Sequence, residues 1–89
     1  MIGEKEMTAI RKLAEKYKIK RVLLFGSCLR DGKGHHDIDM AVEGLKKSEF
    51  FNFYGEMMFS LEKPVDIVDL SSDSKFNTLI REEGLLIYG

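Results

Sequence analysis

Short apolar runs with strand character alternate with segments of helical periodicity along this chain, and this alternation constrains the fold most. In residues 4–17, apolar side chains recur every three or four positions between Lys and Glu, as in an amphipathic helix. The run at 20–25 fits a buried strand, and residues 37–42 alternate as a strand with one buried face does. This pattern predicts an α/β sandwich. The expected helices span 4–17, 28–31, 46–61 and 74–83, and the expected strands span 20–25, 37–42, 64–70 and 85–88.

Length and charge limit the classes of function. A chain of 89 residues predicts a single domain, residues 1–89, without a separate substrate-binding domain. The net charge of -1 provides no basic field, so direct binding of nucleic acid is not expected. Cys28 is the only cysteine, which excludes an internal disulfide, and no apolar run is long enough to span a bilayer. We therefore expect a cytoplasmic protein, without membrane contact, whose substrate is held by a surface or by a partner.

Three aspartates are predicted to lie on one face of the sheet. Asp37 and Asp39 are two residues apart on a strand, so their side chains project from the same face with Cα atoms about 6.5 Å apart. Asp66 has the same phase in the strand at 64–70 and would join them if the two strands are neighbours. Carboxylate oxygens suit Mg²⁺ or Mn²⁺, and paired ions activate an attacking oxygen and stabilise a leaving phosphate. Asp69 has the opposite phase and is expected to end the strand or cap the next turn.

Gly26 and Ser27 stand at the turn between the first predicted strand and the helix at 28–31. Free backbone N–H groups and the helix dipole at such a turn attract anions. This turn would therefore provide a binding site for a triphosphate beside the metals. No GK[ST] sequence follows Gly26, so a P-loop is not supported.

The order and spacing of Gly26-Ser27, Asp37-Ile38-Asp39 and the later Asp66 resemble the signature of the DNA polymerase β-like nucleotidyltransferase superfamily. The short length and the ending REEGLLIYG resemble its minimal nucleotidyltransferase branch, whose members are often antitoxin partners of small helical HEPN proteins. The resemblance implies a nucleotidyltransferase palm-like α+β fold, a mixed β-sheet with helices packed on one face.

The resemblance also implies an activity and its site. ATP would be the cosubstrate and Mg²⁺ the cofactor, and AMP would be transferred to a hydroxyl, with a tyrosine of a HEPN-type toxin as the expected acceptor. An oligomer or a hetero-complex stays open. The residues carried over are Asp37 and Asp39 as catalytic metal ligands, Asp66 as a catalytic group at the same metal site that helps to activate the acceptor, and Gly26, Ser27 and Arg30 as nucleotide-binding residues.

The same residues have other interpretations. The aspartates could simply be the solvated face of a strand. His35 and His36 next to Asp37 suggest zinc or an HD hydrolase, but an HD hydrolase needs further spaced His and Asp ligands that this chain lacks. The chain departs from many relatives at Asp31 and His36, where they carry glycine and serine. An acid at position 31 would repel a nucleotide if it faced the site.

The segment at 48–63 contains more apolar residues than one core-facing stripe needs. It predicts either a thick core or an exposed surface that a partner covers. Two functions therefore stay open at this point. The first is an enzyme that moves AMP to a partner protein, and the second is a catalytically weak or inactive antitoxin-like module that neutralises its partner by contact.

Overall fold

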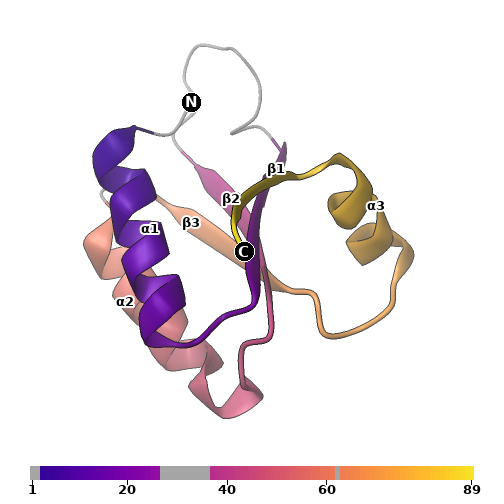
Figure 1. Cartoon of the computed structure of the whole chain (residues 1–89), viewed down its shortest axis with the longest axis horizontal. Helices are drawn as coiled ribbons and strands as arrows, with labels where there is room; N and C mark the ends of the chain where they lie inside the picture. Colours follow the sequence, from indigo (N-terminus) through magenta and orange to yellow (C-terminus); the bar gives the residue numbers. More distant parts are fainter. Residues whose placement is uncertain (1–2, 27–36, 62) are drawn as a thin grey trace.

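The computed structural model describes residues 3–26, 37–61 and 63–89, which form a sheet with helices on both sides (Figure 1). None of the described helices is long and apolar enough to cross a membrane. The elements are α1 (Glu4–Lys16), β1 (Arg21–Phe25), β2 (Ile38–Glu43), the 3-10 turn η2 (Lys47–Glu49), α2 (Phe50–Ser60), β3 (Val65–Asp69), α3 (Lys75–Glu83) and β4 (Leu85–Tyr88).

The sheet has the strand order β3-β2-β1-β4. Strand β1 is antiparallel to both β2 and β4, whereas β2 and β3 are parallel, so the expected mixed sheet is confirmed. The segment expected at 85–88 is the edge strand β4. It follows directly on α3, whose C-cap is Gly84, and the backbone N–H of Gly84 donates to the carbonyl of Ile80 at 2.7 Å.

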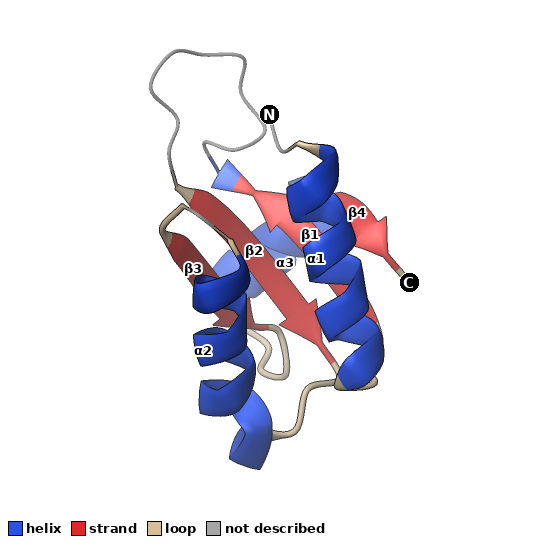
Figure 2. Cartoon of the chain, turned by 90° about the vertical axis from the view of Figure 1, so that its left-hand side faces the viewer, coloured by secondary structure: helices blue, strands red, loops and turns tan. Residues whose placement is uncertain are grey.

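The helices are divided between the two faces of the sheet, as Figure 2 shows. Helices α1 and α2 cover one face and bury the larger core with β2 residues such as Ile38 and Met40. Helix α3 packs on the opposite face, where Ile80 contacts a smaller core with Leu23 and Ala41. The expectation that all helices pack on one face is therefore wrong in this detail. The reason is that β1 and β2 are apolar in both phases, which gives α3 an apolar surface of its own.

Helix α2 accounts for the broad apolar segment. Phe53 and Met57 are buried in the larger core. Phe51 and Phe59, in contrast, are 85% and 93% exposed. Part of the segment is thus on the surface, and the interpretation as a thick core alone is wrong.

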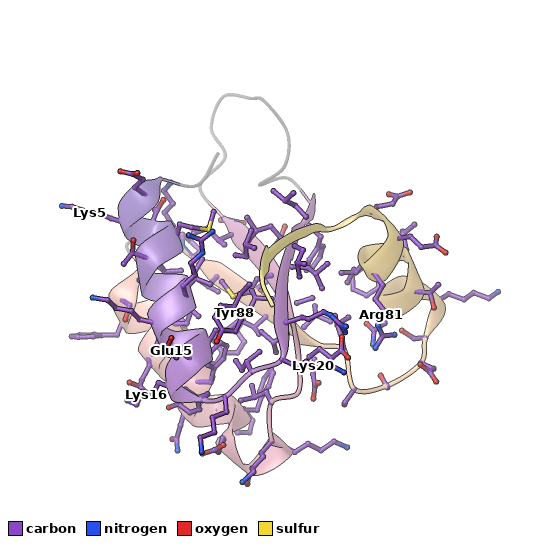
Figure 3. The ribbon with its side chains drawn as sticks, viewed as in Figure 1. Lys5, Glu15, Lys16, Lys20, Arg81 and Tyr88 are labelled. Atoms are coloured by element: carbon purple, nitrogen blue, oxygen red, sulfur yellow. The ribbon has the colours of Figure 1, made fainter. Side chains whose placement is uncertain are left out.

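Polar contacts connect α1 to α2. Lys16, labelled in Figure 3, pairs with Glu56 at 2.7 Å, and the hydroxyl of Tyr17 donates a hydrogen bond to the same carboxylate. This hydrogen bond, with desolvation, raises the pKa of Tyr17 to about 12. The ion pair is exposed, so it contributes little to stability. The two helices are held mainly by their apolar contacts.

The connection from β3 to α3 is fixed by hydrogen bonds. The buried side-chain amide of Asn77 donates to the carbonyls of Ser72 (2.9 Å) and Asp69 (3.3 Å). The backbone N–H of Asn77 donates to the hydroxyl of Ser74, the N-cap of α3. Arg81, labelled on α3 in Figure 3, donates to the carbonyl of Leu70. These contacts hold α3 over the face that carries the predicted site.

Candidate active site

Asp39 and Asp66 lie side by side in the sheet. They are register partners in the parallel pair of β2 and β3, and neighbouring strands are about 4.8 Å apart. The residues on either side of each aspartate belong to the core under α1 and α2. Because side chains alternate along a strand, both aspartates belong to the opposite face, which α3 covers in part. The predicted common face is therefore confirmed, and the condition that the two strands are neighbours is met.

Asp37 directly precedes β2 and is exposed, as is Asp66, whereas Asp39 is half-buried. Within residues 3–26, 37–61 and 63–89, no three His, Cys, Asp or Glu side chains form a group that could hold a metal ion. Asp39 and Asp66 are thus neighbours in the described chain, and the convergence of Asp37 with them stays a prediction. Like charges repel, so carboxylates this near one another separate unless a cation lies between them. Their oxygens are nevertheless the donors that hard divalent cations such as Mg²⁺ prefer.

Gly26 follows β1 and lies against the carboxylate of Asp39. Its φ is +70°, and a Cβ atom at this position would be 2.5 Å from Oδ2 of Asp39. Only glycine combines this backbone conformation with so close an approach. The contact follows from the antiparallel register, in which Phe25 pairs with Asp39. Sequence reasoning assigned Gly26 to phosphate binding and missed this steric role, because the register of the two strands was not known.

Several predicted residues lie outside the described part of the chain. Ser27 and Arg30, assigned to nucleotide binding, are among them, and so is the helix expected at 28–31. Asp31 and the histidine pair at 35–36 are also outside it. Their roles stay predictions.

Asp69 is three positions after Asp66 on β3, so its side chain belongs to the opposite face of the sheet. It is the last residue of β3, and its Oδ1 accepts a hydrogen bond from the backbone N–H of Ser71 at 2.9 Å. This side chain caps the turn that leads toward α3. The prediction that Asp69 ends the strand and serves the next turn is confirmed.

A cavity of about 430 Å³, not foreseen from the sequence, opens between the end of β1 and α3. Its position is on the carboxylate face of the sheet, because Phe25 packs against the smaller core under α3. The exposed apolar side chains of Phe76 and Leu79 on α3 were the signal that could have revealed it. The described lining consists of Phe25, Gly26, Phe76, Leu79, Ile80, Glu83 and Gly84.

Residues 8–89 match the sequence model of the family described as Polymerase beta, Nucleotidyltransferase. The chain belongs to this nucleotidyltransferase family. The resemblance inferred from Gly26-Ser27, Asp37-Ile38-Asp39 and Asp66 is thus confirmed at the level of the family. No curated protein matches this nucleotidyltransferase significantly.

Solved structures support the same assignment. A chain in the crystal structure of the toxin–antitoxin MntA–HepT is 25% identical, with a TM-score of 0.74, over 98% of this nucleotidyltransferase and 73% of that chain. A mutant of that toxin–antitoxin, in which two aspartates two positions apart are replaced by glutamate, gives 25% identity and a TM-score of 0.75. That match covers 93% of this nucleotidyltransferase and 72% of the other chain. The expected fold of a minimal nucleotidyltransferase is therefore confirmed.

The contact between Gly26 and Asp39 gives a test of the site. We expect Gly26→Ala to reduce nucleotidyl transfer about a hundredfold, because the methyl group would displace the Asp39 carboxylate. The left-handed backbone should also lower the free energy of unfolding by about 1–2 kcal/mol. Steady-state kinetics and urea unfolding measure the two effects.

Gly55→Ala is the matched control for this substitution. Gly55 lies in α2, and a Cβ there would meet no atom within 4 Å beyond its chain neighbours and the backbone of its own helix. Alanine should stabilise the helix at this position by about 1 kcal/mol and leave transfer unchanged. If Gly26→Ala behaved like Gly55→Ala, the close approach to Asp39 would have no functional role.

Proposed function

We propose that this nucleotidyltransferase transfers AMP from ATP to a tyrosine hydroxyl of a HEPN-type partner protein, as the antitoxin of a toxin–antitoxin pair. The observation that carries the proposal is the placement of Asp39 and Asp66 on adjacent parallel strands, with Gly26 against Asp39. Membership of the nucleotidyltransferase family supplies the reaction class. Residues 1–89 would then form a single minimal nucleotidyltransferase domain.

Each residue has a role in this proposal. Asp37, Asp39 and Asp66 would hold Mg²⁺ through their carboxylate oxygens, which the accessibility of Asp37 and Asp66 permits. When bound, Mg²⁺ would neutralise phosphate charge and so favour attack on phosphorus. The triphosphate would be held next to this site, at the end of β1. The residues proposed to hold it are Gly26, Ser27 and Arg30.

The proposed reaction is an in-line displacement at the α-phosphorus of ATP. The acceptor oxygen forms a bond to this phosphorus, and the bond from the phosphorus to the oxygen that bridges to the β-phosphate breaks. Pyrophosphate leaves with the electron pair of that bond. The proton of the acceptor hydroxyl passes to the carboxylate of Asp66, whose exposure lets a hydroxyl of a second protein reach it.

The similarity to solved toxin–antitoxin structures favours a protein partner. The toxin–antitoxin MntA–HepT contains a chain with the fold of this nucleotidyltransferase, which supports a two-protein system here. The mutated aspartates named for that toxin–antitoxin have the same spacing as Asp37 and Asp39. A protein acceptor also agrees with the net charge of -1, which would not attract a polynucleotide.

A second candidate is neutralisation of the partner by contact alone. It is favoured by the exposed side chains of Phe51 and Phe59 on α2, and by the lack of a three-carboxylate group among the described residues. Thermal unfolding distinguishes the two candidates. A rise in Tm that requires both ATP and Mg²⁺ supports the enzyme, whereas no change supports the binding module.

The direct test uses the HEPN-type protein that copurifies with this chain. The partner is incubated with ATP, Mg²⁺ and the nucleotidyltransferase, and its peptides are examined by tandem mass spectrometry. We expect AMP on a tyrosine, and no AMP when that tyrosine is replaced by phenylalanine. An unmodified partner that still forms a tight complex would overturn the proposed transfer.

A further inference from the structure

The cavity between β1 and α3 has the properties of a site for a flat apolar ring. Its volume of about 430 Å³ is in the range of small-molecule sites, about 300–1,000 Å³. Phe25 and Phe76 form an edge-to-face pair there, with ring centroids 5.8 Å apart. Phe76 is nevertheless 53% exposed and Leu79 is 47% exposed, so about half of the surface of each residue is not buried in the protein.

The cavity lies next to Gly26, at the predicted phosphate-binding turn. Gly26 lines the cavity and is also the residue whose backbone lies against the Asp39 carboxylate. A ring in the cavity would therefore lie beside Gly26, one of the residues proposed to hold the phosphates. The cavity and the proposed phosphate-binding residues are neighbours, as the base and the phosphates of a nucleotide are, because the sugar joins them.

Asp66, the proposed proton acceptor, is on the other side of the site. Asp66 is on β3, Asp39 is on β2, and Gly26 follows β1. Because β2 lies between β3 and β1, Asp39 lies between Asp66 and Gly26 across the sheet. The spacing of strands places β3 and β1 about 10 Å apart. If the ring of the acceptor tyrosine occupied the cavity, Asp39 would separate its hydroxyl from Asp66. The cavity thus suits the donor nucleotide and not the acceptor.

We propose that this cavity binds the base of the nucleotide, with the ring against Phe76 and Leu79. Glu83 is the one charged residue in the described lining, and its carboxylate accepts a hydrogen bond that the amino group of adenine can donate. This inference rests on the proposed nucleotide transfer and adds to it the residues that hold the base.

The test compares ATP with inorganic tripolyphosphate, which lacks the base and sugar. Binding of each to the full chain is measured by calorimetry in MgCl₂. Stacking on an aromatic side chain contributes enough that Phe76→Ala should weaken ATP binding about tenfold or more. Binding of tripolyphosphate should not change. Leu79→Gln is a second variant with the same expected pattern, should Phe76→Ala fail to fold.

Phe51→Ala is the matched control, because Phe51 is an exposed phenylalanine on α2, on the other face of the sheet. It should leave the affinity for ATP unchanged. Equal ATP affinity in Phe76→Ala, Leu79→Gln and the unmodified protein would overturn the base site but not the proposed transfer. A loss of partner binding in these variants with unchanged ATP affinity would assign the cavity to the acceptor. No ATP binding by the unmodified protein would overturn the proposed function and this inference with it.

Discussion

Replacing Asp39 with asparagine should reduce transfer of AMP by at least about a thousandfold while the protein stays folded. Asparagine keeps the shape of the side chain but removes the negative charge that would hold Mg²⁺ beside the reacting phosphate. Metal-ion catalysis supplies several kcal/mol, and each 1.36 kcal/mol corresponds to a factor of ten in rate. We expect the same loss for Asp37→Asn, because Asp37 has the same strand phase.

Stability separates a catalytic role of this pair from a structural one. Removal of one of several neighbouring like charges relieves repulsion, so both variants should be as stable as the unmodified protein or slightly more stable. Urea unfolding and the rate of transfer are measured on the same preparations. Asp73→Asn is the control, since Asp73 is fully exposed and lies outside β2 and β3. Unfolding of either Asp37→Asn or Asp39→Asn would show that the pair is structural.

Asp66→Ala should mainly lower the rate of transfer and Asp69→Ala should mainly lower stability, although the two residues belong to the same strand. Asp66 is the register partner of Asp39, so its loss should lower the rate about 10²–10⁴-fold through loss of the proton acceptor. Asp69 accepts a hydrogen bond from Ser71, so its loss should cost about 1 kcal/mol of stability and leave the rate nearly unchanged.

Kinetics on the folded fraction of each variant measure this difference. The two substitutions are controls for each other, because both remove one carboxylate from β3. A larger loss of rate for Asp69→Ala would mean that the reaction takes place on the opposite face of the sheet.

The shared face of Asp39 and Asp66 could be predicted because the apolar residues in each strand determine its phase, whereas their proximity also required β2 and β3 to be neighbours. Ile38 and Met40 in one strand and Ile67 in the other must face the core, so the aspartates between them must face away. The turn formed by Asp69 was predictable for the same reason. Periodicity fixes which face a side chain occupies, and it does so without knowledge of the strand order.

Other features depend on contacts between distant parts of the chain. The approach of Gly26 to Asp39 depends on the register of β1 against β2, which no local pattern specifies. The position of α3 over the opposite face, and the cavity lined by Phe76, depend on how β3 leads into that helix. A single apolar stripe on α3 shows that the helix packs, but not against which face.

The central claim is tested most directly by the fate of the phosphates of ATP. The HEPN-type partner is incubated with this nucleotidyltransferase, Mg²⁺ and ATP labelled on the α-phosphate, and in parallel with ATP labelled on the γ-phosphate. The proposed reaction predicts label in the partner from the α-phosphate only, in a Mg²⁺-dependent manner, and none with Asp39→Asn. Transfer of γ-label would identify a kinase, and no transfer of either label within a tight complex would contradict the account and leave neutralisation by contact.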